Sequence, residues 1–284
     1  MVRKAVIPVA GHGTRFLPIT KSLPKEMLPI VDKPNLQYIV EEAINSGIEE
    51  ILIVSCHEKP EIEEYFTENP ELEELLENAG KFELLKLVQD LNYDVTIDFA
   101  YEDTFSGNGM AIKMAKDFVN GEAFAVMFGD DLMMSDDVPV LKQLIDIHDE
   151  YGCNVVAATQ VAPSEVSNYG IMKLKEGTNI IDTFVEKPKV GEAPSNYAGV
   201  GRYVFNPEVF DELDKLEASP NGEYQLTLTF EPLMEYQEMR ACPFKGTYYN
   251  IGSKLGYLKA NVDYALKRED LKEFKTFLEN KESL

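Results

Sequence analysis

Seven short stretches of mainly apolar residues recur along the chain, and most of them are continuous rather than alternating with polar residues. They are Ala5–Ala10, Glu50–Cys56, Val95–Ala100, Phe124–Phe128, Asn154–Val161, Ile180–Val185 and Tyr197–Phe205. A continuous apolar run of this length is typical of a strand that is buried on both faces of its sheet. We therefore predict a β-strand at each stretch.

Helical spacing of apolar residues separates several of these strands. Between residues 36 and 44 the apolar side chains recur at helical intervals, and Gly47 follows as a residue suited to end a helix. Val138–His148 and Pro207–Leu216 show the same spacing. This alternation predicts an α/β fold with a mixed, mainly parallel central sheet that carries helices on both faces. No repeat or linker divides the sequence, so we expect a single domain over residues 1–284.

Two further segments have the pattern of exposed helices. Glu58–Glu83 holds ten acidic residues against two lysines, which favours a solvated, charged helical face over a metal site. The segment from Leu255 to about Leu278 predicts a C-terminal helix. Ala260, Val262 and Leu266 would supply its buried stripe.

The composition narrows the class of protein. The 284 residues include 27 basic and 50 acidic side chains, for a net charge of −23, and 44% are hydrophobic. This apolar content predicts a folded core. The negative charge argues against nucleic acid or an anionic membrane as a partner, because both would repel the chain. A small anionic ligand is still compatible, because a local basic patch is enough to bind it.

The basic residues are unevenly distributed. Residues 1–34 carry six basic side chains against two acidic ones, and residues 239–262 carry four basic side chains and no acidic one. Two basic islands in an acidic chain favour a small, multiply charged phosphate ligand.

The cysteines and the N-terminal segment indicate a location. Cys56, Cys153 and Cys242 stand apart without metal-site spacing, so we expect buried free thiols in a reducing cytoplasm. The apolar run Ala5–Ala10 is too short to span a membrane. We therefore expect neither a targeting segment nor a membrane segment.

A glycine-containing turn follows the first predicted strand directly. Gly11-His12-Gly13-Thr14-Arg15 would let backbone N–H groups approach phosphate oxygens, and Arg15 adds a phosphate donor. Phe16 stands where a Rossmann fingerprint needs glycine, and no Walker sequence follows. The proline-rich segment Lys21–Ile30 predicts a rigid loop that presents Lys25. The pattern alone fits a phosphate site and a solvated surface loop equally well.

These residues resemble the bacterial-type UTP–glucose-1-phosphate uridylyltransferases. The resemblance is densest over residues 10–34 and continues along nearly the whole chain. It includes Gln37-Tyr38, Gly129-Asp130-Asp131, Tyr169-Gly170, Val185-Glu186-Lys187-Pro188, Gly201-Arg202-Tyr203, Glu223-x-Gln225-Leu226-Thr227 and Gly252-Ser253-Lys254-x-Gly256-Tyr257.

The resemblance implies a fold, a reaction and partners. The fold would be a Rossmann-like nucleotidyltransferase fold, with a nucleotide-binding half over residues 1–135, a sugar-binding half over residues 136–252 and a C-terminal helix over residues 253–284. The phosphate of glucose 1-phosphate would attack the α-phosphate of UTP in line, giving UDP-glucose and pyrophosphate. Because the nucleophile is already an anion, catalysis would consist of positioning and charge neutralisation. Mg²⁺ would be the cofactor, and a homo-oligomer is expected.

The resemblance also assigns roles to residues. The catalytic residues would be Arg15, Lys25, Asp130 and Lys187. The nucleotide would be bound by Ala10, Gly11, Gly13, Thr14, Glu102 and Gly107. The sugar phosphate would be bound by Asp131, Gly170, Glu186, Lys187, Gly201 and Glu223. Asp130 would ligate Mg²⁺ together with Asn250.

Some of these residues also fit simpler roles when the pattern is taken alone. Asp130 and Asp131 could cap a turn after a buried strand. Lys187 could be a surface lysine beside a proline, and Tyr169-Gly170 an ordinary turn. The position of the two aspartates at the carboxyl end of a strand favours a functional role, because α/β sheets bind ligands there.

Four positions depart from the family pattern. Glu102 stands where glutamine usually reads the uracil edge, and Met110 replaces histidine. Leu228 and Asn250 each replace aspartate, and at position 250 this removes a negative charge from the predicted Mg²⁺ site. Three hypotheses follow: an active uridylyltransferase, a non-catalytic subunit that pairs with an active homologue, or the same chemistry with another nucleotide.

Overall fold

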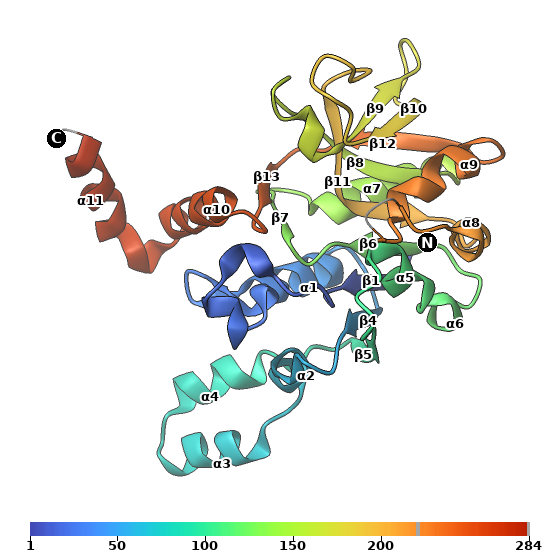
Figure 1. Cartoon of the computed structure of the whole chain (residues 1–284). Coiled ribbons are helices and arrows are strands. Elements are labelled where there is room, and N and C mark those ends of the chain that lie inside the picture. The colour runs from blue at the N-terminus through green and yellow to red at the C-terminus, as the bar shows by residue number, and fades with distance from the viewer. Residues whose placement is uncertain (220–221, 283–284) are drawn as a thin grey trace.

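A nine-stranded mixed sheet forms the centre of the computed structural model, which describes residues 1–219 and 222–282 (Figure 1). Seven strands lie in the order β10-β9-β11-β6-β1-β4-β5, while β8 pairs with β11 and β12 pairs with β8. The strands are β1 (Lys4–Pro8), β4 (Glu50–Ser55), β5 (Thr96–Tyr101), β6 (Phe124–Met127), β8 (Asn154–Gln160), β9 (Gly170–Leu174), β10 (Ile181–Glu186), β11 (Tyr197–Phe205) and β12 (Met239–Pro243).

The sheet contains both parallel and antiparallel pairs of strands. Strand β1 pairs in parallel with β4 and β6, and β4 pairs in parallel with β5. Strand β11 is antiparallel to β6, β8 and β9. Every strand predicted from the sequence is present. Two strands of this sheet, β9 and β12, were not predicted.

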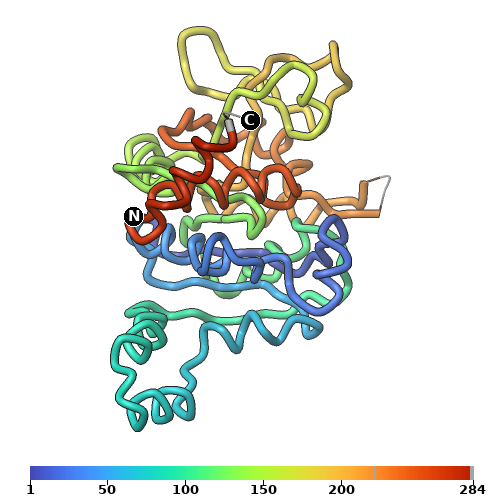
Figure 2. Tube along the Cα trace, turned by 90° about the vertical axis from the view of Figure 1, so that its left-hand side faces the viewer, coloured from blue at the N-terminus to red at the C-terminus, as the bar shows by residue number. Residues whose placement is uncertain are grey.

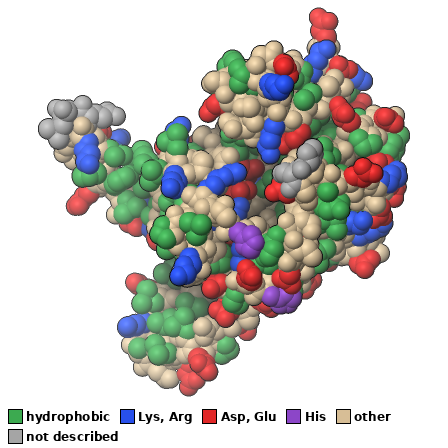
Figure 3. Space-filling model, viewed as in Figure 1, with side chains coloured by type: hydrophobic (Ala, Val, Ile, Leu, Met, Phe, Trp, Pro, Cys, Tyr) green, Lys and Arg blue, Asp and Glu red, His purple; other side chains and the backbone are tan. Residues whose placement is uncertain are grey.

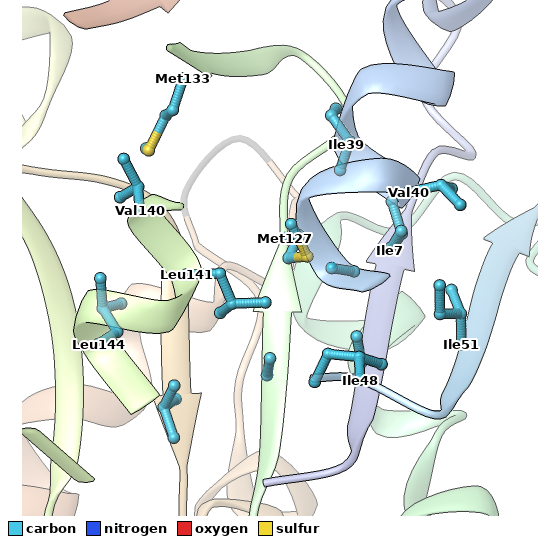
Figure 4. Packing of buried hydrophobic residues seen from close by; sticks show 14 of the residues in the cluster. Ile7, Ile39, Val40, Ile48, Ile51, Met127, Met133, Val140, Leu141 and Leu144 are labelled. Carbon is cyan, nitrogen blue, oxygen red and sulfur yellow. The ribbon is translucent and has the colours of Figure 1, made fainter. Parts of the chain in front are cut away.

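Helices cover both faces of the sheet, as predicted. They are α1 (Asn35–Asn45), α2 (Pro60–Phe66), α3 (Pro70–Asn78), α4 (Phe82–Gln89), α5 (Asn108–Lys113), α6 (Lys116–Val119), α7 (Val140–Tyr151), α8 (Val209–Lys215), α9 (Phe230–Met234), α10 (Lys254–Leu266) and α11 (Lys272–Glu282). Alternate residues of β1 point to opposite faces. Ile7 lies beside α1 in Figure 4, in a buried cluster that also includes residues of α7, and Val6 belongs to a second cluster with residues of α5, α8 and α9. Gly47 follows α1 with a positive φ, as expected for a helix end.

A small antiparallel ladder stands beside the main sheet. Strands β7 (Asp131–Met134) and β13 (Thr247–Asn250) pair so that Asn250 lies opposite Asp131. A second short pair, β2 (Pro29–Ile30) and β3 (Lys33–Pro34), closes the proline-rich loop ahead of α1. The β7–β13 ladder therefore brings Asn250 next to the residues that follow β6.

The predicted single C-terminal helix is wrong. Helix α10 ends at Leu266, a short turn spans Glu269–Leu271, and α11 follows. Figure 1 shows α10 beside β13 and α11 beyond it, and in Figure 2 both helices lie on the side that faces the viewer. Residues 283–284 of the predicted segment lie outside the described residues. Ala260 is buried against a small cluster, but Leu266, which was predicted to be buried with it, is 42% exposed.

The acidic segment forms a lobe of short helices. Pro60 and Pro70 begin α2 and α3, since proline suits the first helical turn. The predicted charged helical face is present, but few of its leucines pack inward: Leu76 is 7% exposed and Leu75 is 60% exposed. Hydrophobic side chains are accordingly visible on this lobe in Figure 3. We therefore correct the prediction to a helical hairpin with an apolar as well as an acidic surface.

The cysteines agree with the prediction. Cys56, Cys153 and Cys242 are all free and buried. Among the described residues, none of the helices has the length and apolar character needed to cross a membrane.

Candidate active site

Two cavities meet at the carboxyl ends of β1 and β6. The first, here called the β1-side cavity, has a volume of about 390 Å³. The second, here called the β11-side cavity, has a volume of about 270 Å³. Four residues line both cavities: Asn108, Phe128, Asp130 and Glu223. The cavities therefore form one cleft with Asp130 at the junction.

The structure brings all the predicted site residues to this cleft, although Arg15, predicted beside the triphosphate, lines the β11-side cavity, and Glu223, predicted on the sugar side, lines both. The β1-side cavity is lined by Ala10, Gly11, Gly13, Thr14, Lys25, Glu102 and Gly107. The β11-side cavity is lined by Arg15, Asp131, Gly170, Glu186, Lys187, Gly201 and Asn250. Their placement fits the predicted roles, which remain predictions.

The turn after β1 packs closely on the proline-rich loop. Gly13 adopts a left-handed conformation, with φ of 65°, and a Cβ atom there would lie 2.9 Å from Cβ of Lys25. Only glycine combines this φ with so close an approach at low cost. Thr20 donates its hydroxyl to the carbonyl of Gly13 at 2.9 Å, which fixes the turn further.

Lys25 and Asp130 form an ion pair at the junction of the cavities. Nζ of Lys25 lies 2.6 Å from Oδ2 of Asp130. Burial alone would lower the pKa of Lys25, but the charges of Asp130 and Glu26 outweigh burial and raise it. Burial likewise opposes ionisation of Asp130, yet Lys25 and Arg15 hold its pKa below the ordinary value. Both groups are therefore charged at neutral pH.

Asp131 is held by two donors on the β11 side. Oδ2 accepts from the backbone N–H of Gly201 at 2.9 Å, and Oδ1 accepts from the hydroxyl of Tyr248 at 2.7 Å. The register of β11 shifts between Val200 and Tyr203, a bulge that frees the N–H of Gly201 from the ladder. Burial, together with the negative charge of Asp130, raises the pKa of Asp131 to about 6.

Glu186 ends strand β10 at the β11-side cavity, and Lys187 follows it. Lys187 has φ of 46°, a left-handed conformation uncommon outside glycine, and its N–H donates to the carbonyl of Tyr169 at 3.0 Å. Its Nζ lies 3.5 Å from Oε1 of Glu186, and 53% of its side chain is exposed. Glu186 keeps its buried Oε2 without a hydrogen-bond partner among the described residues. This arrangement presents a half-exposed cation and a free acceptor to the cavity.

Asp130 and Asn250 supply the oxygen donors of the predicted metal site. Both reach Gly252: a Cβ atom there would lie 2.9 Å from Oδ2 of Asp130 and 3.1 Å from Oδ1 of Asn250. A carboxylate and a carboxamide oxygen suit a hard cation such as Mg²⁺, so the donor chemistry fits. Within the described residues, no three His, Cys, Asp or Glu side chains gather around a metal-sized space. The protein therefore offers one carboxylate and one neutral ligand here.

Two of the four departures from the family pattern line the cleft. Glu102 is 5% exposed, and its Oε1 accepts from the backbone N–H of Thr104 at 2.9 Å and from the Thr104 hydroxyl. Asn250 is the second. Met110 and Leu228, both within the described chain, line neither cavity. Substitutions at positions 102 and 250 therefore bear most directly on function.

Sequence reasoning missed several residues that line the cleft. Phe128 and Asn108 belong to both cavities, and Tyr248 holds Asp131. A signal for Tyr248 exists in the sequence, because residues two apart on a strand share a face and Asn250 is two residues further on. Asn108 directly follows Gly107, which was the residue predicted to bind the nucleotide in this segment.

The fold and site define a class: an α/β protein whose β1 turn and proline-rich loop carry Arg15 and Lys25 to a cleft formed by two cavities. The sequence model of the nucleotidyl transferase family matches residues 4–267. The chain belongs to this family.

Relatives and solved structures cover nearly the whole chain. A Streptococcus pyogenes protein named UTP–glucose-1-phosphate uridylyltransferase 2 is 48% identical over 279 residues, which are 96% of this chain and 93% of the relative. A UTP-bound UGPase from Acinetobacter baumannii is 36% identical with a TM-score of 0.90, covering 98% of this chain and 99% of that one. A UDP-glucose pyrophosphorylase complexed with UDP-glucose is 40% identical with a TM-score of 0.83, covering 94% and 100%. These structures confirm the predicted nucleotidyltransferase fold.

Proposed function

We infer that the protein transfers the uridylyl group of UTP to glucose 1-phosphate and releases pyrophosphate. The observation that carries this proposal is the position of Asp130, Lys25 and Arg15 where the two cavities meet. The family, and relatives named for this reaction or solved with UTP or UDP-glucose, support these substrates.

The β1-side cavity would hold UTP. Ala10, Gly11, Gly13, Thr14 and Gly107 line it with backbone that can approach the nucleotide closely. Lys25 reaches the junction, and Arg15 lies beside the neighbouring space of about 310 Å³ that the turn and Gly252 enclose. Two cations would then lie around the triphosphate and the leaving pyrophosphate.

The β11-side cavity would hold glucose 1-phosphate. Lys187 would bind the phosphate, and the free Oε2 of Glu186 would accept from a sugar hydroxyl. Asp131, Gly170, Gly201 and Glu223 complete the wall. Because Asp131 is anchored by Gly201 and Tyr248, its role would be to shape the cavity beside the metal ligand Asp130.

The reaction needs no strong general base. An oxygen of the sugar phosphate, already an anion, forms a bond to the α-phosphorus of UTP. The bond from that phosphorus to the β-phosphate oxygen breaks, and pyrophosphate leaves with the electron pair. Arg15 and Lys25 stabilise the charge that accumulates on the phosphoryl oxygens. Mg²⁺, held by Asp130 and Asn250, would neutralise further phosphate charge when bound.

The proposal extends to organisation and location. Residues 1–135 would form the nucleotide-binding half, residues 136–252 the sugar-binding half and residues 253–284 a C-terminal arm. The free, buried cysteines support a cytoplasmic location, where thiols stay reduced.

A pyrophosphate-release assay tests the function. With UTP, glucose 1-phosphate and saturating Mg²⁺, we expect turnover, and in competition with dTTP and CTP we expect UTP to be preferred. Glu102 makes this competition informative, because an ionised carboxylate only accepts hydrogen bonds, whereas the glutamine of the family pattern can also donate one. Absence of pyrophosphate from folded protein contradicts the proposal and supports a non-catalytic binding or regulatory subunit, the alternative that Asn250 favours. Preference for another nucleotide assigns Glu102 to altered base selection.

The projecting arm supports a homo-oligomer. Leu255, Leu258 and Phe277 are 65%, 60% and 52% exposed on α10 and α11. Apolar residues gathered on a projecting segment are typical of a contact with a second chain. We expect light scattering to give a mass that is a multiple of the chain mass, and replacement of Leu255 and Leu258 by serine to lower it. A monomeric mass at micromolar concentration contradicts this part of the proposal.

A further inference from the structure

Lys59 is a buried lysine outside both cavities whose ammonium group binds the turn after β1. Its Nζ donates to the carbonyl oxygens of Val9 at 2.5 Å and Gly11 at 2.6 Å. It also donates to Oε2 of Glu26 at 3.0 Å. A lysine ammonium has three N–H donors, and these three acceptors use all of them. Lys59 therefore ties the β1 turn to the loop that carries Lys25.

The direction of these carbonyl groups fixes the direction of the neighbouring amides. In a planar trans peptide the C=O and N–H bonds point to opposite sides, and neither peptide here is cis. Because the carbonyls of Val9 and Gly11 point at Lys59, the N–H groups of Ala10 and His12 point away from it. Ala10 and His12 both line the β1-side cavity. We propose that Lys59 is a positioning residue that turns these two N–H donors toward the nucleotide.

Glu26 extends this link to the ion pair at the junction. Its side chain has no exposed area, and its Oε1 lies 3.8 Å from Nζ of Lys25, which in turn contacts Asp130 at 2.6 Å. Four groups of alternating charge thus run from Lys59 to Asp130. Without the ammonium of Lys59, Glu26 would compete with Asp130 for Lys25. Loss of Lys59 should therefore disturb Lys25 as well as the turn.

Lys4 provides a matched control at the other end of β1, the strand whose following turn is bound by Lys59. Lys4 is buried at the start of β1, and its Nζ also contacts two carbonyl oxygens and one carboxylate. These partners belong to Phe118, Val119 and Glu122, which line neither cavity. Lys59→Met and Lys4→Met therefore remove the same kind of buried ammonium group, one from each end of β1, and both should lower the unfolding temperature. Only Lys59→Met should weaken nucleotide binding in the β1-side cavity.

The inference rests on the proposed binding of UTP in the β1-side cavity. We expect Lys59→Met to raise KM for UTP about ten-fold, because two donors lose their alignment, and to change KM for glucose 1-phosphate by less than about two-fold. Lys4→Met should leave both constants within about two-fold of the unmodified protein. In the ligand-free proteins, amide hydrogen exchange over residues 9–14 should accelerate in Lys59→Met alone.

The exchange measurement needs no substrate, so it separates this inference from the proposed function. If the unmodified protein releases no pyrophosphate from UTP, the proposed function fails, and faster exchange in Lys59→Met still supports Lys59 as the positioning residue of the turn. If the unmodified protein turns over UTP and Lys59→Met keeps its KM, the function holds and the inference is overturned. Equal exchange over residues 9–14 in the two variants also overturns it.

Discussion

Replacing Lys25 by methionine should reduce turnover about a thousand-fold, since the site would lose a preorganised positive charge where phosphoryl charge accumulates. Methionine keeps much of the length and apolar stem of lysine but carries no charge. In the structure the ammonium lies 2.6 Å from Asp130, at the junction of the two cavities. Steady-state pyrophosphate release gives kcat and KM for each substrate. The loss should appear mainly in kcat, with KM for glucose 1-phosphate little changed.

Lys21→Met is the matched control for this substitution. Lys21 lies in the same proline-rich loop, but it is exposed and lines neither cavity. Its replacement should leave kcat within about two-fold, since an exposed charge outside the cleft contributes little to the reaction. Thermal unfolding of both variants establishes that they are folded at the assay temperature. A Lys25→Met protein that keeps a tenth or more of the activity contradicts the role assigned to Lys25.

Most strands of the central sheet could be predicted from the sequence, but β9 and β12 could not. Strands β1 and β6 are apolar on both faces, so each leaves an unbroken apolar run. Strands β9 and β12 contain Lys173 and Arg240 within five residues, which interrupts any such run. The break in the C-terminal helix was missed for a related reason, because the exposed arm has few apolar contacts to define its pattern.

The site residues could be predicted where they belong to a sequence motif, but the contacts between them could not be predicted. The resemblance pointed to Asp130 and Asn250, but only the β7–β13 ladder shows how residues so far apart in sequence come together. Lys59 is the clearest example of a contact that the sequence does not predict. In the sequence it is one lysine in an acidic stretch before Pro60. Its burial against the β1 turn depends on how α2 packs, which no local pattern encodes.

Asn250→Asp should strengthen metal binding by about ten-fold or more. The substitution gives the site a second carboxylate beside Asp130, and hard divalent cations favour negatively charged oxygen ligands. Without metal the two carboxylates repel each other, so the variant should unfold at a lower temperature in EDTA. Added Mg²⁺ should raise that temperature more than it does in the unmodified protein, because binding to the folded state stabilises it. Electron paramagnetic resonance of Mn²⁺ measures the affinity directly.

Asn168→Asp separates the effect of ligation from the effect of charge. Asn168 lines the same β11-side cavity as Asn250, but it is an exposed residue of the short turn Val166–Asn168. The Asn168→Asp substitution adds the same negative charge but no ligand beside Asp130, so Mn²⁺ affinity should rise less than about two-fold. Equal affinities in the two variants would show that Asn250 is not a ligand. Turnover then distinguishes the two hypotheses about the chain. If the unmodified protein is an active enzyme, Asn250→Asp should raise its activity mainly at low Mg²⁺. If the unmodified protein is a subunit inactivated by the missing carboxylate, it should show no turnover, and Asn250→Asp should show turnover.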